Sequence, residues 1–194
     1  MAPTSDELLA SLPETFRSSD ALEYISERQF RRLKDNGSII ALSRGLYRKS
    51  DWLGDEDLIK ITAKAPQATL CLRSALARHE LIDDIPAEID IAIPRGSWTP
   101  ETAAPVRWCH FARDTFSLGR EALGIEGGRS IGLYSAERSI IDAFRMRHIE
   151  GADLANEALK RWLRRGGQPS ELLRLARSFP RIQTALRETL EILL

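Results

Sequence analysis

Basic side chains are concentrated in one short stretch near the N-terminus. Between Arg28 and Lys49 the chain carries seven basic residues and one acid, although its formal net charge is zero. Arginine can donate two parallel hydrogen bonds to guanine, whereas lysines and additional arginines mostly neutralise phosphates. The stretch therefore predicts binding of duplex DNA. We assign Arg28, Gln29 and Arg32 to base edges, and Arg31, Lys34, Arg44, Arg48 and Lys49 to phosphates.

Two other interpretations of this basic stretch remain open. A charge-rich helix face is often simply solvated, and it can also bind an acidic protein, which would make the chain a protein interaction module. Aromatic residues do not alternate with the basic ones, as a stacking platform for single strands requires, so duplex DNA is favoured. Steep salt dependence and a preference for one sequence would distinguish DNA binding from protein binding.

A second candidate for chemistry is the pair of carboxylates in "EIDIAI". Glu88 and Asp90 have the spacing at which a nucleotidyltransferase holds Mg²⁺ from one face of a strand. Such enzymes also need a glycine-led turn that lets the backbone approach the phosphates, and the preceding helix begins with "LCLRSA" instead. The simpler interpretation is an alternating strand with Glu88 and Asp90 toward solvent and Ile89 and Ile91 inward. We expect no enzyme and no cofactor, with magnesium-dependent catalysis as the alternative.

The histidines and cysteines give no pattern typical of a metal site or a disulfide framework. No i, i+4 pair or CxxC spacing occurs among them, and two cysteines suit a reducing compartment. These residues are His79, His110, His148, Cys71 and Cys109.

Composition and hydropathy indicate an ordinary globular protein. The chain has 194 residues, of which 43% are hydrophobic and 29% charged, enough for a hydrophobic core. No apolar run approaches the roughly 18 residues of a membrane span, and the first twenty residues contain no apolar signal region. We therefore expect a cytoplasmic protein that does not bind a membrane.

Local signals predict a helix for the first half of the basic stretch. Ser26 and Gln29 form a capping box, with Ile25 and Phe30 at the flanking staple positions. Phe30 and Leu33 form the apolar side, so Arg28, Arg31 and Arg32 face away from the core. Asn36-Gly37 ends the helix. After it, "SIIAL", the turn "SRG" and "LYRK" predict a hairpin with Arg44 at its tip.

The elements upstream complete a recognisable layout. Thr4 and Glu7 form another capping box before "LLASL", and "RSSDALEYI" predicts a short helix capped by serine. The order is then helix, short helix, helix and hairpin. This is the layout of a winged helix-turn-helix, whose third helix enters the major groove of DNA.

A glycine among acids in "KSDWLGDED" predicts a domain boundary near Trp52 to Gly54, giving domains 1–53 and 54–194. In the second domain we expect helices in "DEDLIKITAKAP" and "LRSALARHEL" and strands in "EIDIAIP", "VRWCHF" and "RSIGLYS". Four helical patterns follow from Ser135 onward: "SAERSIIDAFRM", "GADLANEALKRWLRRG", "PSELLRLARS" and "PRIQTALRETLEILL". The predicted fold class is α+β, a winged helix-turn-helix followed by a mixed α/β domain with a helical C-terminal tail.

The C-terminal helices are also rich in basic residues. These either extend a DNA-facing surface or are the solvated sides of amphipathic helices. They are Lys160, Arg161, Arg164, Arg165, Arg174, Arg177, Arg181 and Arg187.

The sequence resembles the AbiEi-type antitoxins and transcriptional regulators of type IV toxin–antitoxin and phage-abortive systems. The resemblance lies in "SRGLYRKSD", in "ATLCLRSALARHELIDDIPAEIDIAIPRGS", and in "EGGRSIGLYSAERSIIDAFRMRHIEGADLANEALKRWL". It covers most of residues 15–165 and is loose after Arg165.

This resemblance implies an autorepressor that binds inverted-repeat operator DNA upstream of its own operon through the N-terminal domain. It also implies a cognate toxin encoded nearby, usually nucleotidyltransferase-like, whose effect the C-terminal domain counteracts without a stable complex being required. Inverted repeats imply two protomers on each operator. The resemblance adds no catalytic residue.

Overall fold

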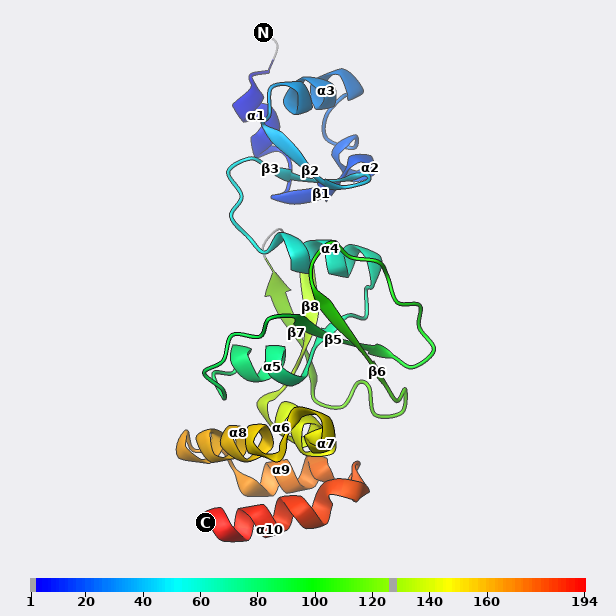
Figure 1. Cartoon of the computed structure of the whole chain (residues 1–194). Coiled ribbons are helices and arrows are strands. Elements are labelled where there is room, and N and C mark those ends of the chain that lie inside the picture. Colours follow the sequence, from blue (N-terminus) through cyan, green and yellow to red (C-terminus); the bar gives the residue numbers. More distant parts are fainter. Residues whose placement is uncertain (1–2, 126–128) are drawn as a thin grey trace. The chain divides into compact units, whose positions relative to one another are not determined.

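The computed structural model describes residues 3–125 and 129–194 and has an α+β fold with helices and two kinds of sheet (Figure 1). The chain divides into two compact units. The first comprises Met1–Lys64 and Gly124–Ser130, and the second Ala65–Leu123 and Ile131–Leu194. In the described part of the chain, no helix has the length and apolar character needed to cross a membrane.

The first unit combines short helices with a small antiparallel sheet. Its helices are α1 (Ser5–Ala10), α2 (Ser18–Ala21), α3 (Glu27–Asp35) and α4 (Glu56–Lys64). Its strands are β1 (Thr15–Arg17), β2 (Ile39–Ser43) and β3 (Leu46–Lys49). The strand order is β1-β3-β2 with antiparallel pairing, so β3 is central. The predicted hairpin is therefore confirmed, and β1 is an additional strand that the sequence did not reveal.

Both predicted capping boxes of this unit are confirmed. The carboxylate of Glu7 accepts the Thr4 N–H at 2.7 Å, and the amide oxygen of Gln29 accepts the Ser26 N–H at 2.7 Å. The predicted serine cap of α2 is wrong, because Arg17 occupies the cap position. The reason is that β1 runs directly into α2: the Ser18 N–H donates to the Gly45 carbonyl at 2.9 Å, which holds Ser18 against the hairpin.

The core of the first unit extends past the hairpin into α4. One cluster joins the helices to the sheet, and the Tyr47 ring lies edge-on to Phe30 with their centroids 5.0 Å apart. A second cluster contains Leu46, Trp52 and Ile59, with Ile125 packed against it. Because Ile59 belongs to α4, this unit continues to Lys64, beyond the boundary expected near Trp52 to Gly54.

The second unit is built around a mixed sheet. Its strands are β4 (Thr69–Leu70), β5 (Ile89–Pro94), β6 (Val106–Phe111), β7 (Arg120–Ile125) and β8 (Arg129–Tyr134). Residues 124–125 of β7 and 129–130 of β8 belong to the first unit. The order is β6-β5-β4-β8-β7, with β4 antiparallel to β5 and parallel to β8, and β5 parallel to β6. The strands expected in "EIDIAIP", "VRWCHF" and "RSIGLYS" are present, and β4 and β7 were not expected.

Helix α5 packs against β5, and α6 to α10 pack on one another beyond it (Figure 1). They are α5 (Leu72–Arg78), α6 (Ala136–Arg145), α7 (Arg147–Glu150), α8 (Ala152–Arg164), α9 (Pro169–Ala176) and α10 (Gln183–Leu193), with a 3₁₀ turn at Pro180–Ile182. Their shared core includes Leu76, Ile140, Leu159, Leu172 and Leu186. The helical C-terminal tail is thus confirmed, although the last pattern begins with the 3₁₀ turn.

Candidate nucleic-acid interface

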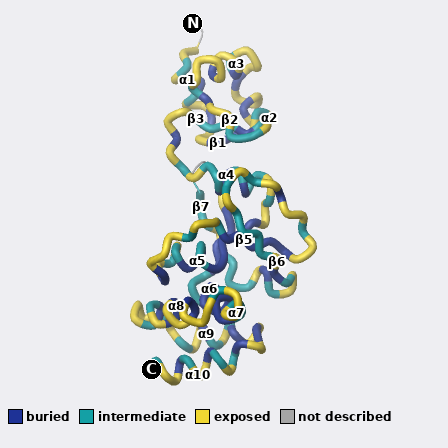
Figure 2. Tube along the Cα trace, in the orientation of Figure 1, coloured by how far each residue is buried: buried dark blue, intermediate teal, exposed yellow. Residues whose placement is uncertain are grey.

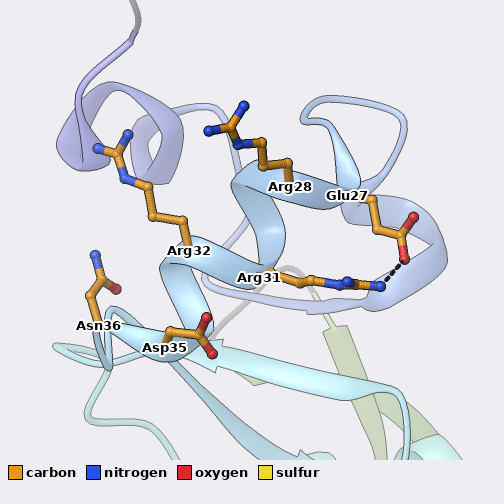
Figure 3. A pocket seen from close by; sticks show the side chains of 6 residues that line it. All are labelled: Glu27, Arg28, Arg31, Arg32, Asp35 and Asn36. Carbon is orange, nitrogen blue, oxygen red and sulfur yellow. Dashed lines mark hydrogen bonds and ion pairs between the residues drawn. The ribbon is translucent and has the colours of Figure 1, made fainter.

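Helix α3 separates an apolar side from a basic side. Phe30 and Leu33 are buried, Leu33 completely, while Arg28, Arg31 and Arg32 are exposed. Helix α3 accordingly contains both buried and exposed positions (Figure 2). This follows from the helical repeat of about 100° per residue, which places Phe30 and Leu33 on one side of the helix and the three arginines outside that side. The exposed side borders an open depression of about 650 Å³, lined by Glu27, Arg28, Arg31, Arg32, Asp35 and Asn36 (Figure 3).

The three arginines differ in what holds them. Arg28 and Arg32 extend from the same side of α3, whereas Arg31 lies along the helix toward Glu27 (Figure 3). The Arg31–Glu27 ion pair measures 2.9 Å, and both side chains are more than two-thirds exposed. Such surface pairs contribute little and exchange readily for another anion.

The side chain of Arg32 is positioned by α1. Its Nη2 donates to the Ser5 hydroxyl at 3.1 Å, and the same hydroxyl accepts from the Asn36 amide at 3.3 Å. Arg28 has no ion pair and no side-chain hydrogen bond to any residue in the described ranges. Two guanidinium groups are therefore available on one side of α3: that of Arg32 is oriented by Ser5, and that of Arg28 is not held by a hydrogen bond within the described residues.

Gln29 is already committed to the helix cap. Its amide oxygen accepts both the N–H and the hydroxyl of Ser26, at 2.7 and 2.8 Å. A bidentate contact to adenine needs the amide oxygen and nitrogen together. Gln29 could make that contact only by giving up its part of the cap.

The other basic residues of the stretch are either exposed or held in ion pairs within the first unit. Arg44 is exposed at the turn, where Gly45 has a φ of +74°, and Lys34 is exposed at the end of α3. Arg48 instead bonds the Glu56 carboxylate at 2.7 Å and the carbonyls of Lys49 and Ser50 at 3.0 and 3.1 Å.

Lys49 is similarly engaged, through a 3.0 Å ion pair with Glu14, and its side chain is 13% exposed. The structure thus brings Arg28, Arg31 and Arg32 to one surface and leaves Lys34 and Arg44 exposed. In contrast, hydrogen bonds or ion pairs to other residues of the first unit hold the side chains of Gln29, Arg48 and Lys49.

Some residues of this surface were not found by sequence reasoning. The Ser5 hydroxyl accepts hydrogen bonds from both Arg32 and Asn36, and Tyr24 is 61% exposed in the connection between α2 and α3. Asn36 was recognised only as a helix end. Ser5 is far from Arg32 in the sequence, so only the packing of α1 against α3 could identify it.

The expectation that Asp90 faces solvent is wrong. Its side chain is buried, with one oxygen 2.6 Å from Arg107 Nε and the other accepting the Arg73 N–H at 3.0 Å. Glu88 is exposed, so the two carboxylates do not share an open face. The alternation fails because β5 lies between β4 and β6 with both faces covered, which buries every residue from Asp90 to Pro94.

Asp90 belongs to an ionic network that joins β5, β6, α5 and α7. Glu150 bonds Arg107 at 2.5 Å and Arg73 at 3.0 Å, and its side chain is 4% exposed. Burial alone would raise the pKa of the Glu150 carboxyl, but hydrogen bonds from Arg107 and Arg73 outweigh it and hold this pKa below its ordinary value. In this arrangement the carboxylates hold arginines and are not free for a cation.

The remaining candidate residues are dispersed. His79 Nε2 lies 2.7 Å from the Tyr134 carbonyl oxygen, and His110 Nε2 lies 3.1 Å from the Thr99 hydroxyl. Within residues 3–125 and 129–194, no group of three or more His, Cys, Asp or Glu side chains could hold a metal ion. Of the basic residues in the C-terminal helices, Arg161 pairs with Asp83 and Glu157, while Arg165 pairs with Glu80.

No protein-family model matches this chain, and no curated protein matches it significantly.

Proposed function

We propose that the first unit is a winged helix-turn-helix that binds duplex DNA, with α3 in the major groove and the β2–β3 hairpin beside the phosphate backbone. The observation that carries this proposal is the exposed basic side of α3, where Arg28, Arg31 and Arg32 stand clear of the core. The order α1, β1, α2, α3, β2, β3 and the β1-β3-β2 sheet support it, because a winged helix has its elements in this sequence.

The contacts within the first unit reduce the number of basic residues that we propose for direct contact with DNA. Arg28 and Arg32 are the base-reading arginines, and Arg31, Lys34 and Arg44 bind phosphates. Arg48 and Lys49 contribute to the interface indirectly, by fixing the hairpin through Glu56 and Glu14.

The resemblance to AbiEi-type antitoxins supports a more specific proposal. The protein is a bacterial, cytoplasmic antitoxin that binds inverted repeats upstream of its own operon as two protomers and represses that operon. Its second unit counteracts a nucleotidyltransferase-like toxin encoded nearby and is not itself an enzyme.

The decisive experiment is fluorescence anisotropy of the full chain on the DNA upstream of its gene, against a scrambled duplex, over a range of salt concentrations. We expect tight binding with a clear preference for the native duplex. Arg32→Ala should lose that preference, whereas Arg187→Ala, which removes an exposed arginine of α10, should retain it. Weak binding that ignores sequence and disappears by physiological salt would refute DNA recognition and favour an acidic protein partner.

A further inference from the structure

The second unit contains a buried ionic cluster that lies outside the surface proposed for DNA binding. Arg138 and Asp142 of α6 are completely buried, and Arg138 Nε bonds Asp142 at 2.9 Å. Arg145 bonds the other oxygen of Asp142 at 2.5 Å. The Nη1 of Arg138 donates to the carbonyl oxygens of Thr115 and Leu118, both at 2.6 Å.

This cluster has an excess of positive charge. Two guanidinium groups share one carboxylate, and arginine stays protonated in proteins. Burial raises the pKa of Asp142 while Arg138 and Arg145 oppose that rise. If Asp142 is ionised the cluster carries one net positive charge, and if it is protonated the excess is larger. An unbalanced charge inside a protein is costly, so the site favours an anion nearby.

The cluster also has an unused hydrogen-bond donor. Arg138 Nη2 is buried and has no hydrogen-bond partner. Aromatic rings compensate part of the charge: the guanidinium carbon of Arg138 lies 4.3 Å from the Tyr134 ring centroid, and those of Arg138 and Arg145 lie 4.7 and 4.9 Å from that of Phe179. Ring faces attract cations but do not neutralise them.

A cavity of about 470 Å³ lies beside this cluster, with Arg145 and Phe179 in its wall. That volume is within the range of pockets for small molecules. Thr115, Ser178 and Arg181 also line it, which adds hydroxyl groups and a second guanidinium to its wall. Asp114 is the one acid in the lining described, and its carboxylate already accepts the Thr115 N–H at 2.9 Å.

We propose that this cavity binds a small organic phosphate, with Arg145 and Arg181 on the phosphate and the apolar wall around Phe179 against the organic part. Arginine pairs bidentately with phosphate, and the three terminal oxygens of a monoester can use both guanidinium groups and a hydroxyl together. With Arg181 and an ionised Asp142 and Asp114 included, one positive charge remains in excess, which favours binding of an anionic phosphate.

The test is isothermal titration calorimetry of the full chain at low salt, with adenosine monophosphate as the probe and inorganic phosphate, adenosine and citrate as comparisons. We expect the monophosphate to bind with a Kd below about 1 mM and more tightly than inorganic phosphate. Adenosine, which lacks the phosphate, and citrate, which offers carboxylates only, should bind at least about tenfold more weakly. Absence of monophosphate binding, or citrate binding as tight, overturns the proposal.

Matched variants locate the site without disturbing the buried ion pairs. Arg181→Ala should weaken monophosphate binding at least about tenfold, because its guanidinium lines the cavity. Arg177→Ala removes the same charge from an exposed neighbouring position outside the lining and should leave the Kd unchanged, as should Arg28→Ala on α3. Equal Kd values for Arg181→Ala and Arg177→Ala would place the phosphate elsewhere and refute the assignment.

Discussion

Arg32 and Arg48 carry the same guanidinium group in very different surroundings. The Arg32 side chain hydrogen-bonds the Ser5 hydroxyl and stands on an exposed helix side, whereas the Arg48 side chain is 16% exposed and bonds Glu56 and backbone carbonyls. A phosphate would have to displace those bonds before Arg48 could bind it. Basic composition alone therefore overstates the number of basic side chains that are available to bind an anion.

The first residue-scale prediction compares Arg32→Ala with Arg44→Ala. Loss of a bidentate guanine contact costs about 1–3 kcal/mol, so Arg32→Ala should weaken the native duplex and relax specificity. Arg44→Ala should weaken all duplexes about equally, because it removes a phosphate contact that carries no sequence information. Anisotropy on native and scrambled duplexes measures both. If Arg32→Ala binds the best duplex as tightly as the unmodified protein does, Arg32 reads no base.

The second residue-scale prediction concerns the pH dependence contributed by Glu150. Its pKa in the folded protein lies below the ordinary value of 4.5, so its ionised form stabilises the fold above that value. This contribution is lost as the pH falls through the lower, folded-state pKa. We expect Glu150→Gln to reduce the free energy of unfolding by about 2 kcal/mol at neutral pH, since it leaves Arg73 and Arg107 short of a partner.

Urea unfolding at neutral and acidic pH measures this difference. The difference in the free energy of unfolding between Glu150→Gln and the unmodified protein should decrease as the pH drops below 4.5. Glu188→Gln, at an exposed position of α10, should leave the free energy of unfolding unchanged at both pH values. A gap that stays constant with pH would mean that Glu150 acts through packing and not through its charge.

At the scale of elements, the sequence predictions are accurate where the interacting residues are close in the sequence and fail where they are far apart. A capping box joins residues three apart, so the starts of α1 and α3 could be identified from the sequence. Strand β1 pairs with β3 through Thr15 and Arg48, and β4 has only two residues. Neither is long enough to show an alternating pattern of its own.

Asp90, one of the two carboxylates considered for magnesium, illustrates the same limit. Its burial depends on Arg107 of β6 and on the first turn of α5, which no local pattern reveals. The basic side of α3 was predicted because it depends on helical periodicity alone. The engagement of Arg48 and Lys49 was not predicted, because it depends on Glu56 and Glu14.

The element-scale prediction concerns the start of α3. Ser26→Ala should cost about 1 kcal/mol of stability, because it removes the side-chain acceptor of the Gln29 N–H. Ser26→Gly should cost only a few tenths of a kcal/mol, since glycine is itself tolerated at this position. Thermal unfolding of the two variants makes the comparison. If both variants unfold alike, the cap does not limit the stability of α3.

At the scale of the whole molecule, a net charge of zero conceals a local concentration of positive charge. For the proposed function, long-range attraction to DNA would come from local surfaces such as this one and would be sensitive to salt. The phosphate-binding set proposed for each protomer is Arg31, Lys34 and Arg44.

The corresponding prediction is the salt dependence of operator binding. Three phosphate contacts give a slope of log K against log salt of about −3 per protomer. If Arg48 and Lys49 also bound phosphates, the slope would be about −4.5. Anisotropy between low and physiological salt separates these values, and Lys34→Ala should reduce the slope by about 1. A slope near −4.5 would show that the ion pairs with Glu56 and Glu14 open on DNA.

The division of the chain into units has a consequence for its synthesis. The cluster around Trp52 and Ile59 includes Ile125, and Gly124–Ser130 belongs to the first unit although residues 65–123 separate it from Lys64. Proteins emerge from the ribosome N-terminus first and usually fold in that order. Here the core of the first unit stays incomplete until Ile125 has been made, after much of the second unit. A nascent chain that stops at Lys64 would therefore leave the cluster of Leu46, Trp52 and Ile59 partly uncovered, although the cluster beneath the basic helix would already be complete.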